Sequence, residues 1–191
     1  MKVGVLALQG DVAEHIAAMK RAVRGKGNVI AVKKPEQVGG LDALVIPGGE
    51  STTIGKLMQK YGIDKAVLAK PELAIFGTCA GAILLAKEIE NYEQFSLKLM
   101  DISVARNAFG RQRESFEAEL RIPQLGEKPF HAVFIRAPVI TRAGGGVEVL
   151  ARVNDAIVLA RQGRYLACAF HPELTRDSRL HRYFIEEVAA P

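Results

Sequence analysis

The sequence contains no tryptophan and only two cysteines, Cys79 and Cys168, in 191 residues. The two cysteines form neither a Cys-x-x-Cys pair nor a zinc-type spacing, so we expect no metal site built on them. No apolar run approaches the roughly 20 residues of a membrane-spanning helix. The basic and apolar opening of a secretory signal is also absent. We therefore expect a cytoplasmic protein, in which a disulfide between the two cysteines is disfavoured.

Clusters of basic residues interleaved with aromatics are missing too, although the formal net charge is +5. Scattered Lys and Arg side chains are typical of a solvated surface, so we expect neither a nucleic-acid nor a membrane partner. Hydrophobic residues make up 49% of the chain and charged residues 25%, as in ordinary globular proteins. The length predicts a single domain, 1–191, with a substantial core.

The spacing of apolar residues predicts alternating strands and helices in the first half. Val- and Leu-rich runs at 2–8, 28–32, 43–46 and 73–77 are typical of buried parallel strands, and helices are expected at about 12–23, 51–61 and 80–89. Asp11 and Glu14 have the spacing of a capping box. The second half predicts strands at 99–104, 116–121, 130–135, 147–153, 156–161 and 165–170, then a helix at 178–188. The fold class is α/β: a doubly wound, mostly parallel sheet flanked by helices, with some antiparallel strands in the second half.

Cys79 stands at the centre of Gly77-Thr78-Cys79-Ala80-Gly81, between a predicted strand and a predicted helix. This pattern is typical of a nucleophile elbow, whose tight turn requires small residues on either side. The helix start favours a thiolate at Cys79, and the Ala80 N–H is placed to stabilise an oxyanion. The alternative is a cysteine packed at a helix start. Cys168 lies in an apolar strand and is more simply a small buried side chain.

A thiolate nucleophile needs a proton carrier, and His171 is the best placed of the four histidines. It follows the strand that ends near Phe170, and such strand ends hold the ligands of open α/β sheets. Pro172 favours an extended backbone at His171, so Glu173 reaches the same side and is placed to orient the imidazole. His15 and His181 fall in predicted helices and His131 in an apolar strand, where solvated or packed roles are the simpler interpretation.

The segment Pro47-Gly48-Gly49-Glu50-Ser51-Thr52-Thr53 also joins a strand to a helix, so it borders the same edge of the sheet. Its glycines allow backbone amides to approach a ligand closely. The alternative is a simple helix cap, in which Ser51 is the N-cap residue. The Lys-Ser/Thr ending of a Walker motif is missing, so nucleotide binding is disfavoured.

These three segments together resemble the class I, triad-type glutamine amidotransferases, a flavodoxin-like family. The resemblance narrows to the glutaminase subunits of pyridoxal 5'-phosphate synthase. It extends in order from about residue 2 to 188. The segments that carry it, besides the elbow, are Leu8-Gln9-Gly10, 47–53, 106–112 from Arg106 to Gln112, Ser115-Phe116-Glu117, 134–138 from Phe134 to Pro138, and 170–174 from Phe170 to Leu174.

The resemblance implies roles for particular residues. It implies that Cys79, His171 and Glu173 carry catalysis. It places Gly48, Gly49, Glu50, Arg106, Ile135 and Arg136 against L-glutamine, makes the Gly49 and Ala80 amides the oxyanion donors, and links Gln9 to activation by the partner. It implies no cofactor and no metal. The implied partner is a (β/α)₈-barrel synthase subunit in a large hetero-oligomer, which uses the ammonia to make pyridoxal 5'-phosphate (vitamin B6).

Three alternatives remain at this point. The chain could serve another acceptor, such as imidazole glycerol phosphate synthase, but the 106–112 segment favours the vitamin B6 family. It could be a cysteine hydrolase of another kind, which would not explain His171 and Glu173 two residues apart. It could be a regulatory subunit without catalysis, against which the intact Cys-His-Glu set argues.

Overall fold

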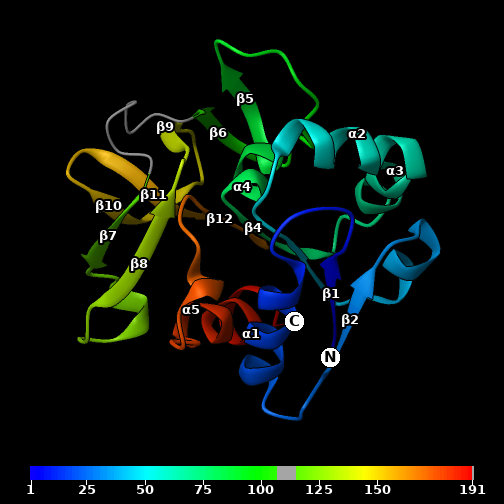
Figure 1. Cartoon of the computed structure of the whole chain (residues 1–191), viewed down its shortest axis with the longest axis horizontal. Coiled ribbons are helices and arrows are strands. Elements are labelled where there is room, and N and C mark those ends of the chain that lie inside the picture. Colours follow the sequence, from blue (N-terminus) through cyan, green and yellow to red (C-terminus); the bar gives the residue numbers. More distant parts are fainter. Residues whose placement is uncertain (107–114, 191) are drawn as a thin grey trace.

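The computed structural model describes residues 1–106 and 115–190. The described residues form a ten-stranded sheet and a separate two-stranded ribbon (Figure 1). The strands of the sheet are β1 (Lys2–Leu6), β2 (Asn28–Val32), β3 (Ala43–Ile46), β4 (Ala74–Thr78), β5 (Ala86–Glu90), β6 (Met100–Ala105), β9 (Val139–Ala143), β10 (Glu148–Val153), β11 (Ala156–Gln162) and β12 (Tyr165–Cys168). The ribbon pairs β7 (Ser115–Leu120) with β8 (Phe130–Ile135).

The order of strands in the sheet is β2-β1-β3-β4-β12-β11-β9-β6-β5, and β10 pairs with β11. From β2 to β12 every neighbouring pair is parallel. The pairs of β11 with β12, β10 and β9, and of β9 with β6, are antiparallel. Strand β12 therefore joins the two halves and lies directly beside β4. This pairing places the segments that follow β4 and β12 at the same edge of the sheet.

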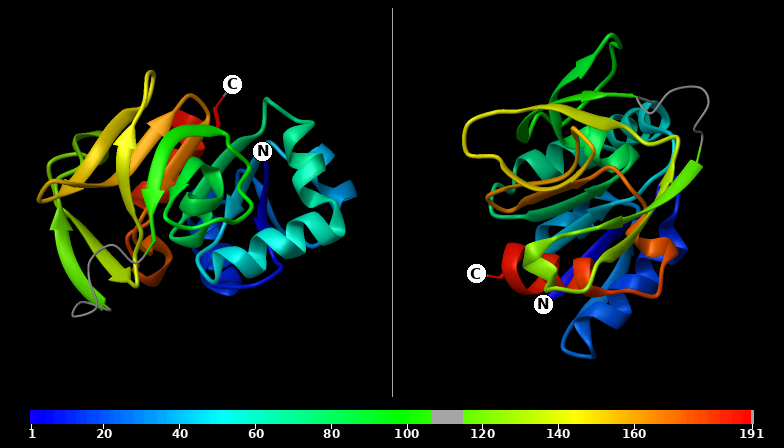
Figure 2. Two further views of the ribbon diagram at one scale, coloured as in Figure 1. Left: turned by 90° about the horizontal axis from the view of Figure 1, so that it is seen from above. Right: turned by 90° about the vertical axis from the view of Figure 1, so that its left-hand side faces the viewer.

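Helices cover both faces of the parallel half, and each face has its own apolar core (Figures 1 and 2). Helices α1 (Val12–Val23) and α5 (Arg179–Tyr183) and the π-helical turn η4 (Phe184–Val188) pack on one face, where Phe76 meets Phe184 with ring centroids 5.3 Å apart. Helices α2 (Ser51–Tyr61), α3 (Ile63–Leu68) and α4 (Ala80–Leu85) cover the other face. Short 3-10 turns complete the described elements: η1 (Pro35–Gly40), η2 (Pro123–Leu125) and η3 (Pro172–Leu174).

The α/β class, the mostly parallel first half and the antiparallel strands of the second half are confirmed. The helix predicted at 80–89 is wrong beyond Leu85, because Ala86–Glu90 pairs with β6 as strand β5. Strands β5 and β9 and helix α3 were not predicted. No helix in the described part of the chain has the length and apolarity required to cross a bilayer.

The capping box predicted at Asp11 is wrong, and the alternative in which Ser51 is the N-cap of the next helix is not what the structure shows. Asp11 makes no side-chain cap to α1, because its carboxylate faces His171 instead of the helix amides. Helix α2 begins at Ser51, and its N-cap is Glu50, whose carboxylate accepts hydrogen bonds from the backbone N–H groups of Thr52 and Thr53. Asp11 thus leaves the capping role that the local sequence assigns to it, and Glu50 takes the capping role that the local sequence assigns to Ser51.

Candidate active site

Cys79 lies in the turn between β4 and α4, with a strained backbone at φ 47° and ψ −103°. Its N–H donates to the Cys168 carbonyl at 2.7 Å, which ties the turn to β12. A Cβ atom on Gly77 would lie 2.5 Å from the Gly81 carbonyl group, and one on Gly81 would lie 2.1 Å from the Ile46 carbonyl oxygen. Both positions therefore exclude any side chain, as the predicted elbow requires.

His171 reaches the same edge from the neighbouring strand β12. Its N–H donates to the Val133 carbonyl at 2.8 Å, and this bond fixes the segment against β8. Its Nδ1 lies 2.7 Å from Glu173 Oε1 within a buried pair. Because Pro172–Leu174 forms a 3-10 turn, Glu173 folds behind the imidazole with a fully buried side chain. The structure thus brings Cys79, His171 and Glu173 together as the sequence predicted.

The charges in this group are strongly coupled. Burial disfavours the charged form of His171, but its interactions with Cys79 and Glu173 outweigh burial and raise the pKa of His171 to about 10. Burial raises the pKa of Glu173, and its contact with His171 opposes that shift. An imidazolium between a sulfur and a carboxylate is the state that these contacts favour. Such a group is suited to holding a thiolate and returning a proton to a leaving group.

Asp11 is a second carboxylate beside the imidazole, and the sequence analysis did not identify it. Its Oδ2 lies 3.3 Å from His171 Nδ1. Ligand atoms of Asp11, His171 and Glu173 all lie within 4.8 Å of one another, a spacing that could hold a metal ion. However, His171 Nδ1 is already bonded to Glu173 at hydrogen-bond distance. The cluster is better described as an imidazolium held by two carboxylates.

A pocket of about 340 Å³ opens in front of Cys79. Most of the residues predicted for the site line it: Gln9, Gly49, Glu50, Cys79, Ala80, Arg106, Ile135, Arg136 and His171. Two predicted residues do not. Glu173 lies behind His171, and Gly48 packs so closely that a Cβ there would lie 2.6 Å from His171 Cε1. Four lining residues were not predicted as site residues: Asp11, Ser51, Ile83 and Leu174.

Arg106 is held in place by three neighbours, of which Glu50 also lines the pocket. Its guanidinium donates to Gln94 Oε1 at 3.0 Å, lies 3.3 Å from Glu50 Oε1 and stacks 4.1 Å from the Tyr92 ring centroid. Gln94 Oε1 also accepts a hydrogen bond from Ser51 Oγ at 3.0 Å. These contacts leave Arg106 pre-oriented along the wall. Gln94 and Tyr92 have no motif in the sequence that would identify them.

The carboxylate of Glu50, beside Arg106, is held by hydrogen bonds from Thr52 and Thr53. Burial opposes its ionisation, but hydrogen bonds from the side chains and N–H groups of Thr52 and Thr53 outweigh burial and lower the pKa of Glu50 to about 2. Its own N–H donates to Gln9 Oε1 at 2.8 Å. Gln9 therefore links the β1–α1 loop to the start of α2. At Gly49, where φ is 144°, a Cβ would lie 2.5 Å from Gln9 Oε1.

The segment 106–112, which carries part of the family resemblance, is described only at Arg106. Residues 107–112 of the 106–112 segment lie outside the described residues. Arg106 itself is described and lines the pocket.

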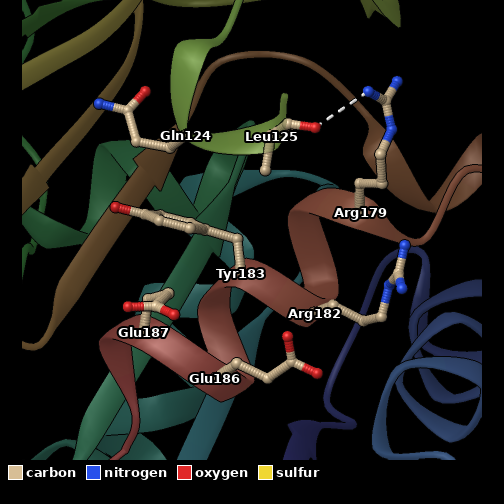
Figure 3. A pocket seen from close by; sticks show the side chains of 7 residues that line it. All are labelled: Gln124, Leu125, Arg179, Arg182, Tyr183, Glu186 and Glu187. Carbon is tan, nitrogen blue, oxygen red and sulfur yellow. Dashed lines mark hydrogen bonds between the residues drawn. The ribbon is translucent and has the colours of Figure 1, made fainter. Parts of the chain in front are cut away.

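A second hollow of about 250 Å³ lies between η2 and α5 (Figure 3). Arg179 extends along one side of it and donates to the carbonyls of Leu125, Lys128 and Pro129, while it pairs with Asp177 at 2.6 Å. Its charge is thus engaged by the chain itself. The contacts tie the turn before β8 to α5.

The sheet, the elbow and the cluster around His171 define a class I glutamine amidotransferase. A crystal structure described as a glutamine amidotransferase is 58% identical to the chain, covers 98% of each chain and superposes with a TM-score of 0.90. The model of the SNO glutamine amidotransferase family matches residues 5–190. This chain belongs to the SNO glutamine amidotransferase family.

Two curated relatives match nearly the whole chain. The pyridoxal 5'-phosphate synthase subunit PdxT of Pelotomaculum thermopropionicum is 62% identical over 98% of this chain and 95% of its own length. The subunit of the same name from Thermus thermophilus is 59% identical over 96% of each.

The raised pKa of His171 gives a direct test of its contact with Glu173. Replacing Glu173 with Gln removes one of the interactions that stabilise the imidazolium, so the pKa of His171 should fall below about 10. NMR titration of histidine-labelled protein measures this shift. His131, which pairs with Glu119 on the ribbon, is an internal control and should titrate as in the wild type. An unchanged His171 titration in Glu173→Gln would contradict the coupling.

The same pKa fixes the sign of the pH dependence of stability. The folded value of about 10 exceeds the ordinary value of 6.5. The stabilisation from protonated His171 is therefore fully present below about pH 6.5 and is lost as the pH rises through about 10. Between these limits, the free energy of unfolding of the wild type should decline more steeply than that of Glu173→Gln.

Proposed function

We propose that the chain is the glutaminase subunit of a pyridoxal 5'-phosphate synthase. It hydrolyses L-glutamine to glutamate and ammonia and passes the ammonia to a synthase subunit. The observation that carries this proposal is the convergence of Cys79 and His171 at one pocket, with Glu173 bonded to His171 from behind. Membership of the amidotransferase family and likeness to two PdxT subunits supply the substrate and the pathway.

The proposed reaction has two stages. The Cys79 thiolate attacks the side-chain amide carbon of glutamine, and His171 protonates the nitrogen that leaves as ammonia. Water then attacks the glutamyl thioester, with His171 taking its proton, and glutamate departs as the Cys79 thiolate is restored. Glu173 keeps the imidazole in the required orientation throughout. The N–H groups of Ala80 and Gly49 are proposed to stabilise the oxyanion of each tetrahedral intermediate.

The proposed glutamine site follows the pocket wall. The guanidinium of Arg106 suits the α-carboxylate, and Glu50 is the partner proposed for the α-ammonium. Ile135 and Arg136 also line the pocket, and Gly49 is proposed to bring its backbone close to the reacting amide, with Gly48 packed against His171. Because Glu50 and Arg106 already contact each other, the two charges are positioned before substrate arrives.

The proposed partner is a (β/α)₈-barrel synthase subunit in a large hetero-oligomer in the cytoplasm. The chain acts as a single amidotransferase domain and would need another subunit to consume its ammonia. Gln9 is proposed to report the docking of that subunit, because its side chain joins the β1–α1 loop to the Glu50 backbone at the pocket. Movement of either loop on docking would reach the proposed oxyanion site directly.

Ammonia release from glutamine tests the proposed function. With the synthase subunit present, Cys79→Ala should lose at least about a thousandfold in kcat, because no other nucleophile lines the described pocket at that position. Cys168→Ala is the matched control, since Cys168 is buried in β12 and donates to the Phe170 carbonyl instead of facing the pocket. It should keep activity near that of the wild type, and wild-type release should rise when synthase is added.

Substantial ammonia release by Cys79→Ala would overturn the mechanism. A wild-type rate that ignores the synthase subunit but rises with another acceptor enzyme would overturn only the pathway.

Substrate recognition is tested at Arg106. In Arg106→Gln the charge-assisted contact with the α-carboxylate is lost, so kcat/KM for glutamine should fall roughly ten- to a hundredfold, mainly through KM. Arg106→Lys should recover part of this loss because it restores charge without the planar fork. Arg142→Gln, which breaks an ion pair with Asp101 away from the pocket, is the control and should leave KM unchanged. Equal KM values for Arg106→Gln and wild type would contradict the assignment.

A further inference from the structure

The buried imidazole of His15 contacts the oxygen of Glu173 that does not bond to His171. Glu173 Oε1 bonds to His171, but Glu173 Oε2 has no aligned hydrogen-bond donor among the described residues. His15 Nε2, from helix α1, lies 3.3 Å from Glu173 Oε2, and both side chains are fully buried. A buried carboxylate oxygen without a donor is costly, so a nearby N–H group is significant.

His15 also contacts the elbow itself. Its Nε2 lies 2.9 Å from Thr78 Oγ1, and Thr78 immediately precedes Cys79. Its Nδ1 has no hydrogen-bond partner among the described residues. On its other side lies the His181 ring, with ring centroids 5.8 Å apart. One imidazole nitrogen therefore faces both segments that build the proposed triad.

The surroundings decide where the His15 proton resides. Burial, together with nearby His181 and His171, lowers the pKa of His15 well below its ordinary value, so the ring is neutral and carries one proton. A proton on Nδ1 would leave a buried donor unpaired and would turn the Nε2 lone pair toward the Glu173 carboxylate. A proton on Nε2 is donated to Thr78 Oγ1, and it places the positive edge of the ring 3.3 Å from Glu173 Oε2. The second tautomer is favoured.

We propose that His15 is a positioning residue for the triad: its Nε2–H bonds to Thr78 Oγ1 and, from 3.3 Å, attracts Glu173 Oε2, which holds the carboxylate that orients His171. This inference rests on the proposed function, because it assigns a role to His15 through Glu173. His15 does not line the pocket and does not touch the substrate. It couples α1 to the β4 elbow and to the turn after β12.

The tautomer is measured without any assay of activity. NMR of the folded full-length chain, labelled with ¹⁵N-histidine, should show His15 protonated at Nε2 alone, and this resonance should shift in Glu173→Gln. A His15 ring protonated at Nδ1 would overturn the proposal. So would an Nε2–H resonance that is unaffected by Glu173→Gln.

Kinetics with the synthase subunit present test the consequence. His15→Leu removes the donor, and kcat should fall roughly ten- to a hundredfold with KM for glutamine nearly unchanged. His15→Gln keeps an amide N–H and should recover much of the loss. His181→Phe is the control: His181 is buried beside His15, its two ring nitrogens have no partner among the described residues, and the change should leave kcat within about twofold of wild type.

The pH profile separates positioning from packing. Glu173 is faced by His171, by Asp11 and by His15. Without the His15 donor its carboxylate should hold a proton to higher pH, so the acidic limb of kcat/KM in His15→Leu should move up by roughly one pH unit. Wild-type kinetics in His15→Leu would overturn the proposal. Equal losses in His15→Leu and His15→Gln, or in His181→Phe, would also overturn it, because packing alone would then explain them.

Failure of this inference is distinct from failure of the proposed function. If Cys79→Ala loses activity while His15→Leu does not, the function stands and the role of His15 falls. If Cys79→Ala keeps activity, the function itself falls, whatever the tautomer of His15.

Discussion

The backbone of Cys79 is the constraint on which the rest of the structure depends. A non-glycine residue at φ 47° and ψ −103° is strained, and the strain persists only because its surroundings fix it. The absence of side chains at Gly77 and Gly81 lets β4 and α4 approach closely, and the bond from Cys79 N–H to the Cys168 carbonyl locks the turn to β12. Since β12 also leads to His171, one strand pairing sets both the nucleophile and its base.

The charged groups around the elbow set the protonation state of His171. His171 lies between the Cys79 sulfur and Glu173, with Asp11 at its exposed side. Burial by itself would discharge the imidazole, and its interactions with Cys79 and Glu173 reverse that outcome. The pocket wall is held in a similar way: Glu50 accepts hydrogen bonds from Thr52 and Thr53, and Arg106 is held by Gln94, Tyr92 and Glu50 before any ligand arrives. Pre-orientation of this kind reduces the ordering that substrate binding must bring about.

Much of this arrangement was predictable because its signals are local. Glycines around Cys79, a histidine after a strand and a glutamate two residues later each follow from backbone geometry, and the structure brings them together. Signals that depend on tertiary contacts were missed. Asp11 has the spacing of a helix cap, yet it faces His171, and Glu50 takes the cap expected of Ser51. The helix predicted through Ile89 gives way to β5, because pairing with β6 overrides local propensity after Leu85. His15 and Gln94 belong to no motif, and only the packing of α1 on the sheet and the loop beside α2 reveal their contacts.

Covalent labelling tests most directly the claim that this frame makes Cys79 the nucleophile. An electrophilic glutamine analogue, applied to the folded chain at neutral pH with the synthase subunit, should attach to Cys79 as mapped by peptide mass spectrometry. It should spare Cys168, which is fully buried and whose thiol pKa is raised by burial. Labelling should be slowed in Glu173→Gln. Attachment to Cys168 in place of Cys79, or an unlabelled Cys79 in the active complex, would contradict the account.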